Sequence, residues 1–236
     1  MTQPNLTLVV HGESGVGKSW LGATAPGPTL IIDAEGGTSW VPGKKLQWDA
    51  IKGTPPPKPE EGEIVVASVK TFQALGIILQ WLQSGKHPFR SVVLDSLTEI
   101  QKRCLDNITG VEAADQRAWG EVLRKMEGLV RAFRDLTIPN GVPTLDSVVF
   151  VAGSQVKDGI TRPHLQGQLG NTLPYFVDAV GYLYLSQNED GEVVRNLLLQ
   201  PLGGFSAKDR TGKFGTKITS PNVADMLALL RGEHNG

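Results

Sequence analysis

The sequence predicts an α/β protein with a mostly parallel central sheet, helices on both faces and an antiparallel hairpin near the C-terminal end. Two observations point to this class. Over the first two thirds of the chain, short apolar runs alternate with segments whose apolar residues recur at helical spacing. Later, two apolar runs flank Asp190-Gly191, a pair typical of a hairpin turn. The 236 residues suit one large domain, so we expect residues 1–236 to form a single unit.

Five strands are predicted before the hairpin, and each is an apolar run that ends at turn residues. Their unbroken apolar character is typical of parallel strands that are covered on both faces. In chain order they span residues 6–10, 29–33, 63–68, 91–96 and 147–155, and the hairpin lies within residues 179–201.

Helices are predicted between these strands from apolar spacing and from the residues that stop them. We expect a helix from about Lys18, one within residues 70–85, a long one near residues 116–136 and a C-terminal one near residues 222–231. Residues 53–63 carry several prolines, which fit neither a helix interior nor a central strand, so this segment should be an exposed loop.

Composition narrows the classes of protein further. The formal net charge of −1 argues against a nonspecific polycation, although one local basic patch could still bind nucleic acid. The single cysteine, Cys104, allows no internal disulfide, which fits a reducing compartment. The sequence shows no signal segment and no apolar run of membrane-spanning length. We therefore expect a cytoplasmic protein with no membrane partner.

Residues 12–19 read GESGVGKS and match the phosphate-binding pattern G-x-x-x-x-G-K-[ST] in full, between a predicted strand and a predicted helix. Glycines let backbone N–H groups turn toward phosphate oxygens, Lys18 would reach the β- and γ-phosphates, and the Ser19 hydroxyl would bind Mg²⁺. The alternative, a chance glycine-rich turn, is disfavoured by this context. We expect ATP and Mg²⁺ as cofactors. The expected nucleotide contacts are Gly12, Glu13, Ser14, Gly15, Val16, Gly17, Lys18, Ser19 and Trp20.

Asp95 ends the apolar strand SVVLD and so occupies the Walker B position. A carboxylate there binds Mg²⁺ directly or through water, and Asp95 is therefore predicted to join Ser19 as a metal ligand. The alternative is an aspartate that caps the following helix.

Hydrolysis also needs a group that orients or deprotonates water. Many P-loop ATPases place a glutamate directly after the Walker B aspartate, but Ser96 occupies that position here. Glu35 is the candidate, because it follows the second predicted strand and ligands gather at the carboxyl ends of parallel strands. Gln155 ends a later strand and could sense the γ-phosphate. From the residues alone, Glu35 could equally be a surface-turn carboxylate and Gln155 an exposed loop amide.

Four segments in this order, GESGVGKS, LIIDAEGG, SVVLDS and VFVAGSQ, resemble the RecA-type recombinase core. The resemblance implies a RecA-like P-loop NTPase fold, with Glu35 as the catalytic glutamate and Gln155 as the sensor. Small phage-encoded RecA-like ATPases, some of them single-strand annealing proteins, are more similar still. They share the DAEGG turn, a RAWG…RAFRDL helix and an AKDRTG ending, so that the resemblance covers about residues 6–217.

The stretch FSAKDRTGKFG, residues 205–215, is rich in basic residues in an otherwise near-neutral chain. RecA-like ATPases hydrolyse at subunit interfaces, where a neighbouring subunit inserts paired basic residues toward the γ-phosphate. The resemblance therefore implies a homo-oligomer, ring or filament, in which Lys208 and Arg210 are catalytic. Residues two apart in extended backbone face the same side, so both cations could meet one phosphate. The alternative is a solvated basic loop.

Two loops hold DNA in the family, and they correspond here to residues 107–119 and 156–171. The second loop contains Lys157, Arg162 and His164, which suits contact with the DNA backbone rather than base reading, and Lys213 extends the patch. A flexible surface loop is the alternative. Trp119 could stack on a base, but a core position is favoured.

The resemblance implies a DNA-stimulated ATPase that acts in phage recombination in the host cytoplasm. Its expected partners are single-stranded DNA, copies of itself and a single-strand-binding protein. Only residues 1–5 precede the first predicted strand, whereas RecA recombinases carry a segment there that docks on the neighbouring subunit. We therefore favour annealing over full strand exchange. The alternatives are a hexameric helicase-like motor and an ATP-binding switch or loader without strong hydrolysis.

Overall fold

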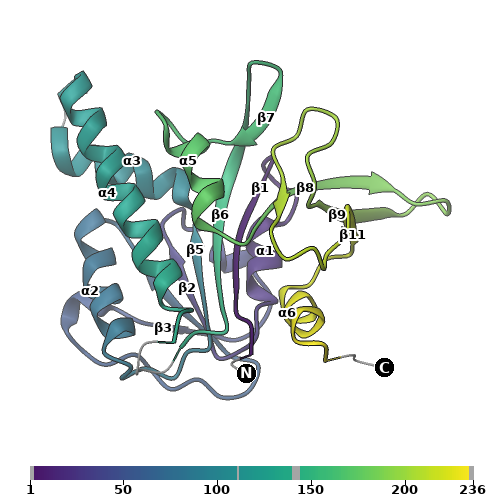
Figure 1. The fold of residues 1–236 in the computed structure, drawn as a ribbon. Helices are drawn as coiled ribbons and strands as arrows, with labels where there is room; N and C mark the ends of the chain where they lie inside the picture. The colour runs from purple at the N-terminus through teal and green to yellow at the C-terminus, as the bar shows by residue number, and fades with distance from the viewer. Residues whose placement is uncertain (1–2, 111, 140–143, 234–236) are drawn as a thin grey trace.

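The computed structural model describes residues 3–110, 112–139 and 144–233 and contains one large central sheet (Figure 1). Across the sheet the strand order is β11-β9-β8-β1-β6-β5-β2-β4-β3, with β10 paired to β8 and β7 paired to β6. The strands from β3 to β8 in this order pair in parallel, whereas β9, β10 and β11 join on the β8 side as antiparallel strands. The prediction of a mostly parallel α/β sheet with an antiparallel hairpin is confirmed.

The predicted strands are all present, and the structure adds short ones. The parallel strands are β1 (Leu6–Gly12), β2 (Thr29–Asp33), β3 (Lys45–Gln47), β4 (Ile64–Ser68), β5 (Ser91–Asp95), β6 (Ser147–Lys157) and the start of β8 (Ala179–Gln187). The antiparallel additions are β7 (Ile160–Pro163), β9 (Val193–Leu198), β10 (Lys208–Asp209) and β11 (Lys217–Thr219).

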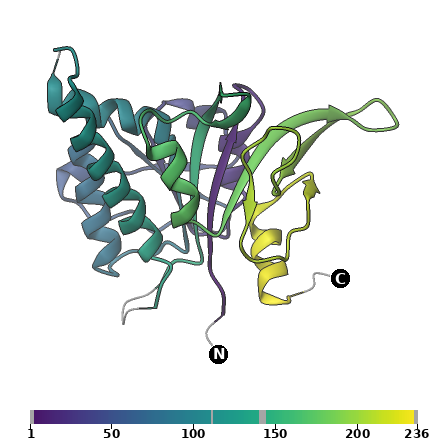
Figure 2. The same ribbon diagram turned by 45° about the horizontal axis from the view of Figure 1, so that its top comes forward.

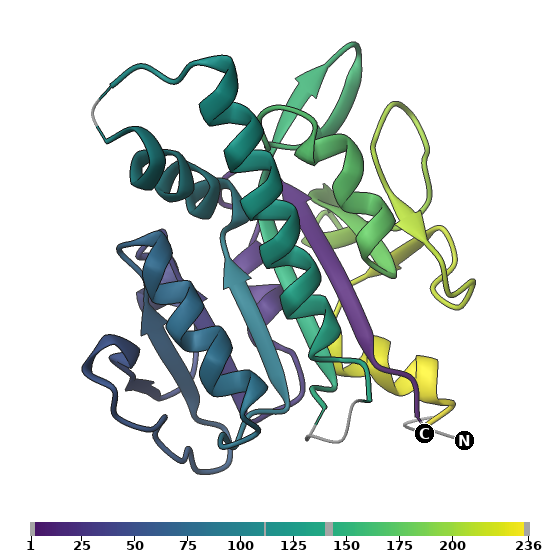
Figure 3. The same cartoon turned by 60° about the vertical axis from the view of Figure 1, so that its left-hand side comes forward.

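Helices cover both faces of the sheet and create two apolar clusters. The larger cluster packs α2 (Phe72–Gln83), α3 (Leu97–Thr109), α4 (Gln116–Asp135) and α5 (Leu169–Phe176) on one face, as Figure 3 shows from that side. The smaller cluster packs α1 (Lys18–Ala23) and α6 (Val223–Arg231) on the other face. Short 3-10 turns, η1 (Gly37–Trp40) and η2 (Ala50–Lys52), connect the strands at the β3 edge. In the described part of the chain, no helix is both long and apolar enough to cross a membrane.

The β8–β9 hairpin extends well beyond the helical layers (Figure 2). Its strands pair from Tyr182 with Leu198 to Gln187 with Val193, around the predicted Asp190-Gly191 turn. Only the first part of β8, from Ala179 to Tyr182, pairs with β1. The rest of β8 extends past the end of β1 and does not pair with it. The start of β8 therefore lies directly beside β1 and parallel to it, and β1 leads into GESGVGKS at Gly12.

Two predicted loops are wrong in part. Residues 107–109 complete α3 and residues 116–119 begin α4, so the first loop is much shorter than residues 107–119; residue 111 lies outside the described residues. Residues 156–171 contain the end of β6, the paired strand β7 and the start of α5. Asp158 and Gly159 make the turn of a β-hairpin, and Pro163 lies within its second strand, so this segment is not a long irregular loop.

A candidate nucleotide site at the carboxyl ends of the strands

The segment between β1 and α1 forms a phosphate loop. Gly15 and Gly17 have φ angles of 81° and 98°, a region that side chains disfavour, so the two glycines allow the loop to turn. At Gly12 an added Cβ would lie 2.4 Å from the Leu183 carbonyl oxygen of β8, and only glycine fits there. The Lys18 ammonium donates a hydrogen bond to the Glu13 carbonyl oxygen across the loop, at 2.6 Å.

Asp95 lies at the carboxyl end of β5, buried and level with Asp33 of the neighbouring strand β2. Burial raises the pKa of Asp95 to about 6, a hydrogen bond from the Ser19 side chain opposes this, and Glu35 and Asp33 raise the pKa further. A hydroxyl and a carboxylate that meet beside a phosphate loop are the oxygen donors that Mg²⁺ prefers. Ser19 and Asp95 therefore fit a magnesium ion, which would supply positive charge to the phosphates.

Glu35 reaches the same place from the turn after β2. The Ser96 hydroxyl donates a hydrogen bond to the Glu35 Oε1 atom, and Ser96 is also the residue that caps α3. The serine that replaces the expected glutamate thus binds a glutamate delivered by the adjacent strand. The structure places Glu35 near Asp95 at the carboxyl edge of the sheet, because β2 and β5 are neighbours there.

The turn that carries Glu35 is held by residues that the sequence reading missed. The Asp33 carboxylate accepts hydrogen bonds from the Gly36 N–H (2.7 Å) and from the Thr38 hydroxyl (2.6 Å). On the other side, the Arg103 guanidinium of α3 donates to the Ala34 carbonyl oxygen at 2.7 Å. The DAEGG motif contained the signal for Asp33, but nothing local indicated Arg103, which is 69 positions away from Ala34.

Lys18 lies in the electric field of this acidic group. Burial lowers the pKa of Lys18, and the carboxylates of Glu35, Asp95 and Glu13 oppose that effect. A cation on α1 and two carboxylates from β2 and β5 therefore face one another at the carboxyl edge of the sheet. This arrangement can bind a phosphate chain, hold Mg²⁺ and place a carboxylate near an attacking water.

Arg195 of β9 approaches the phosphate loop from the opposite side. Its Nε donates to the Val16 carbonyl oxygen at 3.2 Å, although the two residues are 179 positions apart. Its guanidinium lies over the indole of Trp20, with 5.0 Å between the guanidinium carbon and the ring centroid. The sequence reading missed Arg195, because no motif marks it.

Gln155 lies where β6 continues into the β6–β7 hairpin, opposite Arg162. Its amide donates to the carbonyl oxygens of Leu165 (3.2 Å) and Pro163 (3.5 Å), which fastens the segment after β7. In this structure the amide therefore faces the hairpin, and its role as a γ-phosphate sensor stays a prediction.

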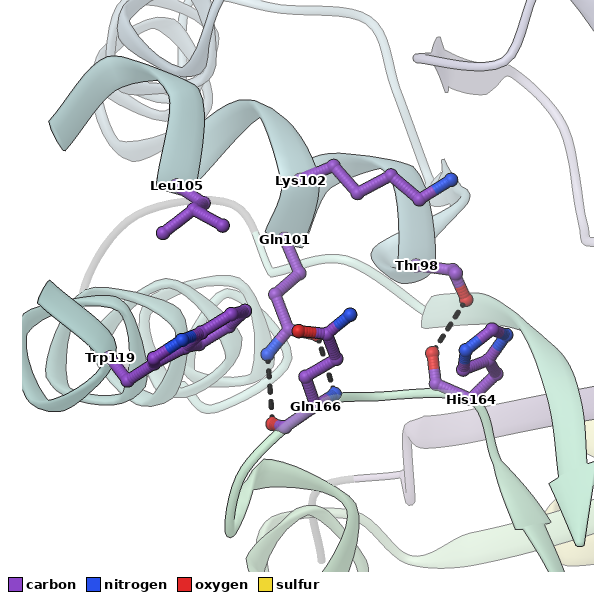
Figure 4. Close-up of a pocket in the computed structure, with 7 residues that line it drawn as sticks. All are labelled: Thr98, Gln101, Lys102, Leu105, Trp119, His164 and Gln166. Atoms are coloured by element: carbon purple, nitrogen blue, oxygen red, sulfur yellow. Dashed lines mark hydrogen bonds between the residues drawn. The ribbon is translucent and has the colours of Figure 1, made fainter. Parts of the chain in front are cut away.

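Helix α3 clamps the same segment from its other side (Figure 4). The buried Gln101 side chain donates to the Gln166 carbonyl oxygen (3.1 Å) and accepts from the Gln166 N–H (2.8 Å). One turn earlier, the Thr98 hydroxyl donates to the His164 carbonyl oxygen (3.1 Å) and accepts from the Gly153 N–H (3.0 Å). Trp119 of α4 packs at the edge of the core and lines the small hollow beside these bonds, which agrees with a mainly structural position.

The candidate DNA contacts divide into exposed and engaged residues. Lys157, His164 and Lys213 are exposed, whereas Arg162 is largely covered and donates to the Asn171 side chain (3.0 Å) and the Lys157 carbonyl oxygen (3.1 Å). Arg162 therefore ties the hairpin to α5. The hairpin also binds the start of the basic stretch, since the Ser206 N–H donates to the Thr161 carbonyl oxygen at 2.8 Å.

Lys208 and Arg210 lie away from the phosphate loop of their own chain. Asp209, between them, pairs with Ala179 of β8, and Ala179 pairs with Leu8 of β1. Leu8 lies four residues before Gly12, which is about 13 Å along the strand. The Lys208 ammonium donates to the carbonyl oxygens of Pro174 (2.5 Å) and Val177 (2.7 Å) at the end of α5.

Arg210 binds the same helix end more loosely. It donates to the Tyr175 carbonyl oxygen at 3.0 Å, its distance to the Asp178 carboxylate is 3.6 Å, and its side chain is 53% exposed. Of the two basic residues, Arg210 is therefore the one that a neighbouring molecule could engage.

Comparison with known proteins adds one match. A family model described as an AAA domain matches residues 4–211, a span that contains the phosphate loop, Glu35, Asp95, the β6–β7 hairpin and Arg210. No curated protein matches the chain.

Proposed function

The chain belongs to the AAA domain family and is a P-loop ATPase, and from this premise we propose that its ATPase is stimulated by single-stranded DNA, which it binds and anneals in recombination. We propose further that ATP is hydrolysed between copies of the chain in a ring or filament. The resemblance of the sequence to small phage-encoded RecA-like annealing proteins supports this role.

One observation carries the hydrolytic part of the proposal, namely the hydrogen bond from Ser96 to Glu35 beside Asp95 and Lys18. It supports a site in which Lys18 and the loop amides bind the phosphates and Ser19 and Asp95 hold Mg²⁺. The Glu35 carboxylate then orients a water and accepts its proton as the water oxygen attacks the γ-phosphorus. The bond to the bridging oxygen breaks, and ADP and phosphate are released.

The DNA-binding part of the proposal is supported by a physical connection between the β6–β7 hairpin and the ATP site. The hairpin carries the exposed Lys157, and the segment after it is clamped by Thr98 and Gln101 of α3. Because Ser96 caps the start of α3, a DNA strand that moves the hairpin would also move the residue that binds Glu35. This is a route by which DNA binding could alter the rate of hydrolysis.

The oligomeric part is supported by the position of Arg210. The register of β10 places Arg210 far from the phosphate loop of its own chain, so it could contribute a charge only to the site of another copy. Such arginines stabilise the charge that spreads over the transferring phosphoryl group.

The test of this function is the ATPase rate measured with and without single-stranded DNA, over a range of protein concentrations. We expect single-stranded DNA to raise the turnover, and the rate per subunit to rise with protein concentration as interfaces form. A Lys18→Ala variant, which lacks the phosphate-binding ammonium, is the control for contaminating ATPases. Turnover that ignores single-stranded DNA at every salt concentration, in a protein that also fails to bind it, would contradict the proposed role.

A further inference from the structure

Trp20 and Arg195 form an aromatic and cationic surface beside the phosphate loop, which we call the Trp20–Arg195 shelf. Trp20 directly follows Ser19, and the residue is 46% exposed, which is unusual for a tryptophan. The Arg195 guanidinium lies over this indole at 5.0 Å. A tryptophan held under an arginine presents a planar, polarisable surface next to the loop.

Arg195 is fixed in this position by the loop itself. Its Nε is bonded to the Val16 carbonyl oxygen, and an added Cβ at Gly17 would lie 2.5 Å from the same nitrogen. Among the described residues, the two terminal guanidinium nitrogens donate no hydrogen bond, and Arg195 is exposed, so their donors are available to a ligand. The arginine is thus held in place through one nitrogen and keeps a polar edge and a flat face.

The shelf lies on the side of the loop opposite the catalytic carboxylates. Glu35 and Asp95 come from β2 and β5, whereas Arg195 comes from β9, and β1 lies between the two groups in the sheet order. A nucleotide whose γ-phosphate points toward Glu35 and Asp95 must extend its nucleoside away from them. On that side of β1 the loop is contacted by Arg195, which lies over Trp20, so the nucleoside would extend toward the shelf.

We propose that the Trp20–Arg195 shelf is the nucleoside subsite, on which the base of a bound nucleoside triphosphate stacks. This inference rests on the proposed ATPase site. It adds a contact for the base of the nucleotide, which the phosphate loop does not bind. Stacking uses the flat face that every base has and reads no edge pattern. The shelf should therefore favour purine over pyrimidine nucleotides through contact area, and discriminate little between ATP and GTP.

The experiment compares two ligands that share phosphates but differ in the nucleoside. The dissociation constants of Mg-ATP and of Mg-tripolyphosphate are measured by calorimetry for wild type and for Arg195→Gln, Arg195→Lys and Trp20→Ala. The control is Arg131→Gln, which removes an arginine stacked over Phe176 at 5.1 Å, in a different part of the molecule. Urea unfolding of each variant shows whether it is folded.

We expect each shelf variant to weaken Mg-ATP binding by about tenfold and to change tripolyphosphate binding less than about twofold, the range for loss of one base-stacking contact. Arg195→Lys should behave like Arg195→Gln, because lysine keeps the charge but lacks the flat face. Equal losses for both ligands would show that Arg195 only braces the loop, and unchanged ATP binding would exclude a base contact; either result overturns the inference. If wild type binds neither ligand, the proposed ATPase function itself fails.

Discussion

Glu35 depends on three neighbours for its position. Asp33 shapes the turn, Arg103 holds its backbone, and Ser96 binds the carboxylate itself. The sequence could predict that Glu35 and Asp95 both lie at the carboxyl edge of the sheet, because each follows a strand of a parallel sheet. It could not predict Arg103 or Arg195, because their contacts join residues far apart in the chain and no local pattern encodes them.

Replacement of Glu35 by glutamine should abolish most hydrolysis and leave nucleotide binding intact. The amide keeps the size of the side chain but cannot accept a proton from water, so kcat should fall roughly 100-fold or more. Steady-state turnover and calorimetric ATP binding measure the two effects separately. Glu61→Gln, in the exposed proline-rich segment, is the matched control. Normal turnover in Glu35→Gln would remove Glu35 from the catalytic role.

His11 should make the folded state sensitive to acid. It is buried, bonded to the Ser154 hydroxyl and the Ser206 carbonyl oxygen, and burial lowers its pKa from 6.5 to about 4. Between these values the unfolded chain binds the proton and the folded chain does not, so this contribution to stability is complete above pH 6.5. It is lost progressively as the pH falls from about 6.5 to about 4.

The measurement is the free energy of unfolding in urea at pH 7, 6 and 5, for wild type and for His11→Gln. Glutamine can form hydrogen bonds there but does not titrate. The pH dependence that comes from all other titratable groups therefore cancels when the two proteins are compared. From pH 7 to pH 5, wild type should lose about 2 kcal/mol more than the variant. Parallel curves for the two proteins would mean that His11 titrates normally in the fold.

Helix α3 connects the nucleotide site to the β6–β7 hairpin. Its first residues follow Ser96, and its next turns bind the backbone of His164 and Gln166. The main strands and helices were predictable from apolar spacing, but β7 and α5 were not. Gly159, Pro163, Gly167 and Pro174 read as loop residues in isolation, whereas pairing with β6 and packing on α4 make this segment regular.

Gln101→Ala tests this connection. The change removes two hydrogen bonds and leaves the Gln166 N–H and carbonyl without their partner, so the free energy of unfolding should fall by about 2–4 kcal/mol. If DNA acts through α3, the variant should also keep its basal ATP turnover and lose stimulation by single-stranded DNA.

Lys102→Gln is the control for this element, because Lys102 is exposed on the same helix and forms a surface ion pair with Glu99. It should change stability by less than about 0.5 kcal/mol. Full DNA stimulation in a folded Gln101→Ala protein would show that the hairpin and the ATP site do not communicate through this clamp.

At the scale of the whole molecule, the sheet order sets which residues can reach one ATP site. Neighbouring strands supply Glu35 and Asp95 on one side and Arg195 on the other, whereas β10 leaves Arg210 near the start of β1. The alternation of strands and helices predicted the parallel sheet, but not the strand order or the short strands β3, β10 and β11. Those depend on pairing between distant segments, which spacing along the chain does not encode.

The most direct test of hydrolysis between copies of the chain is a mixing experiment with two inactive variants. Glu35→Gln lacks the base but offers Arg210, and Arg210→Ala lacks the arginine but offers Glu35. If the arginine acts on a neighbouring site, an equal mixture forms some interfaces with both groups intact, about one quarter of them by random head-to-tail assembly. The account predicts that the mixture recovers up to about that fraction of the wild-type ATP turnover. A mixture whose rate stays at the mean of the two separate variants would contradict it.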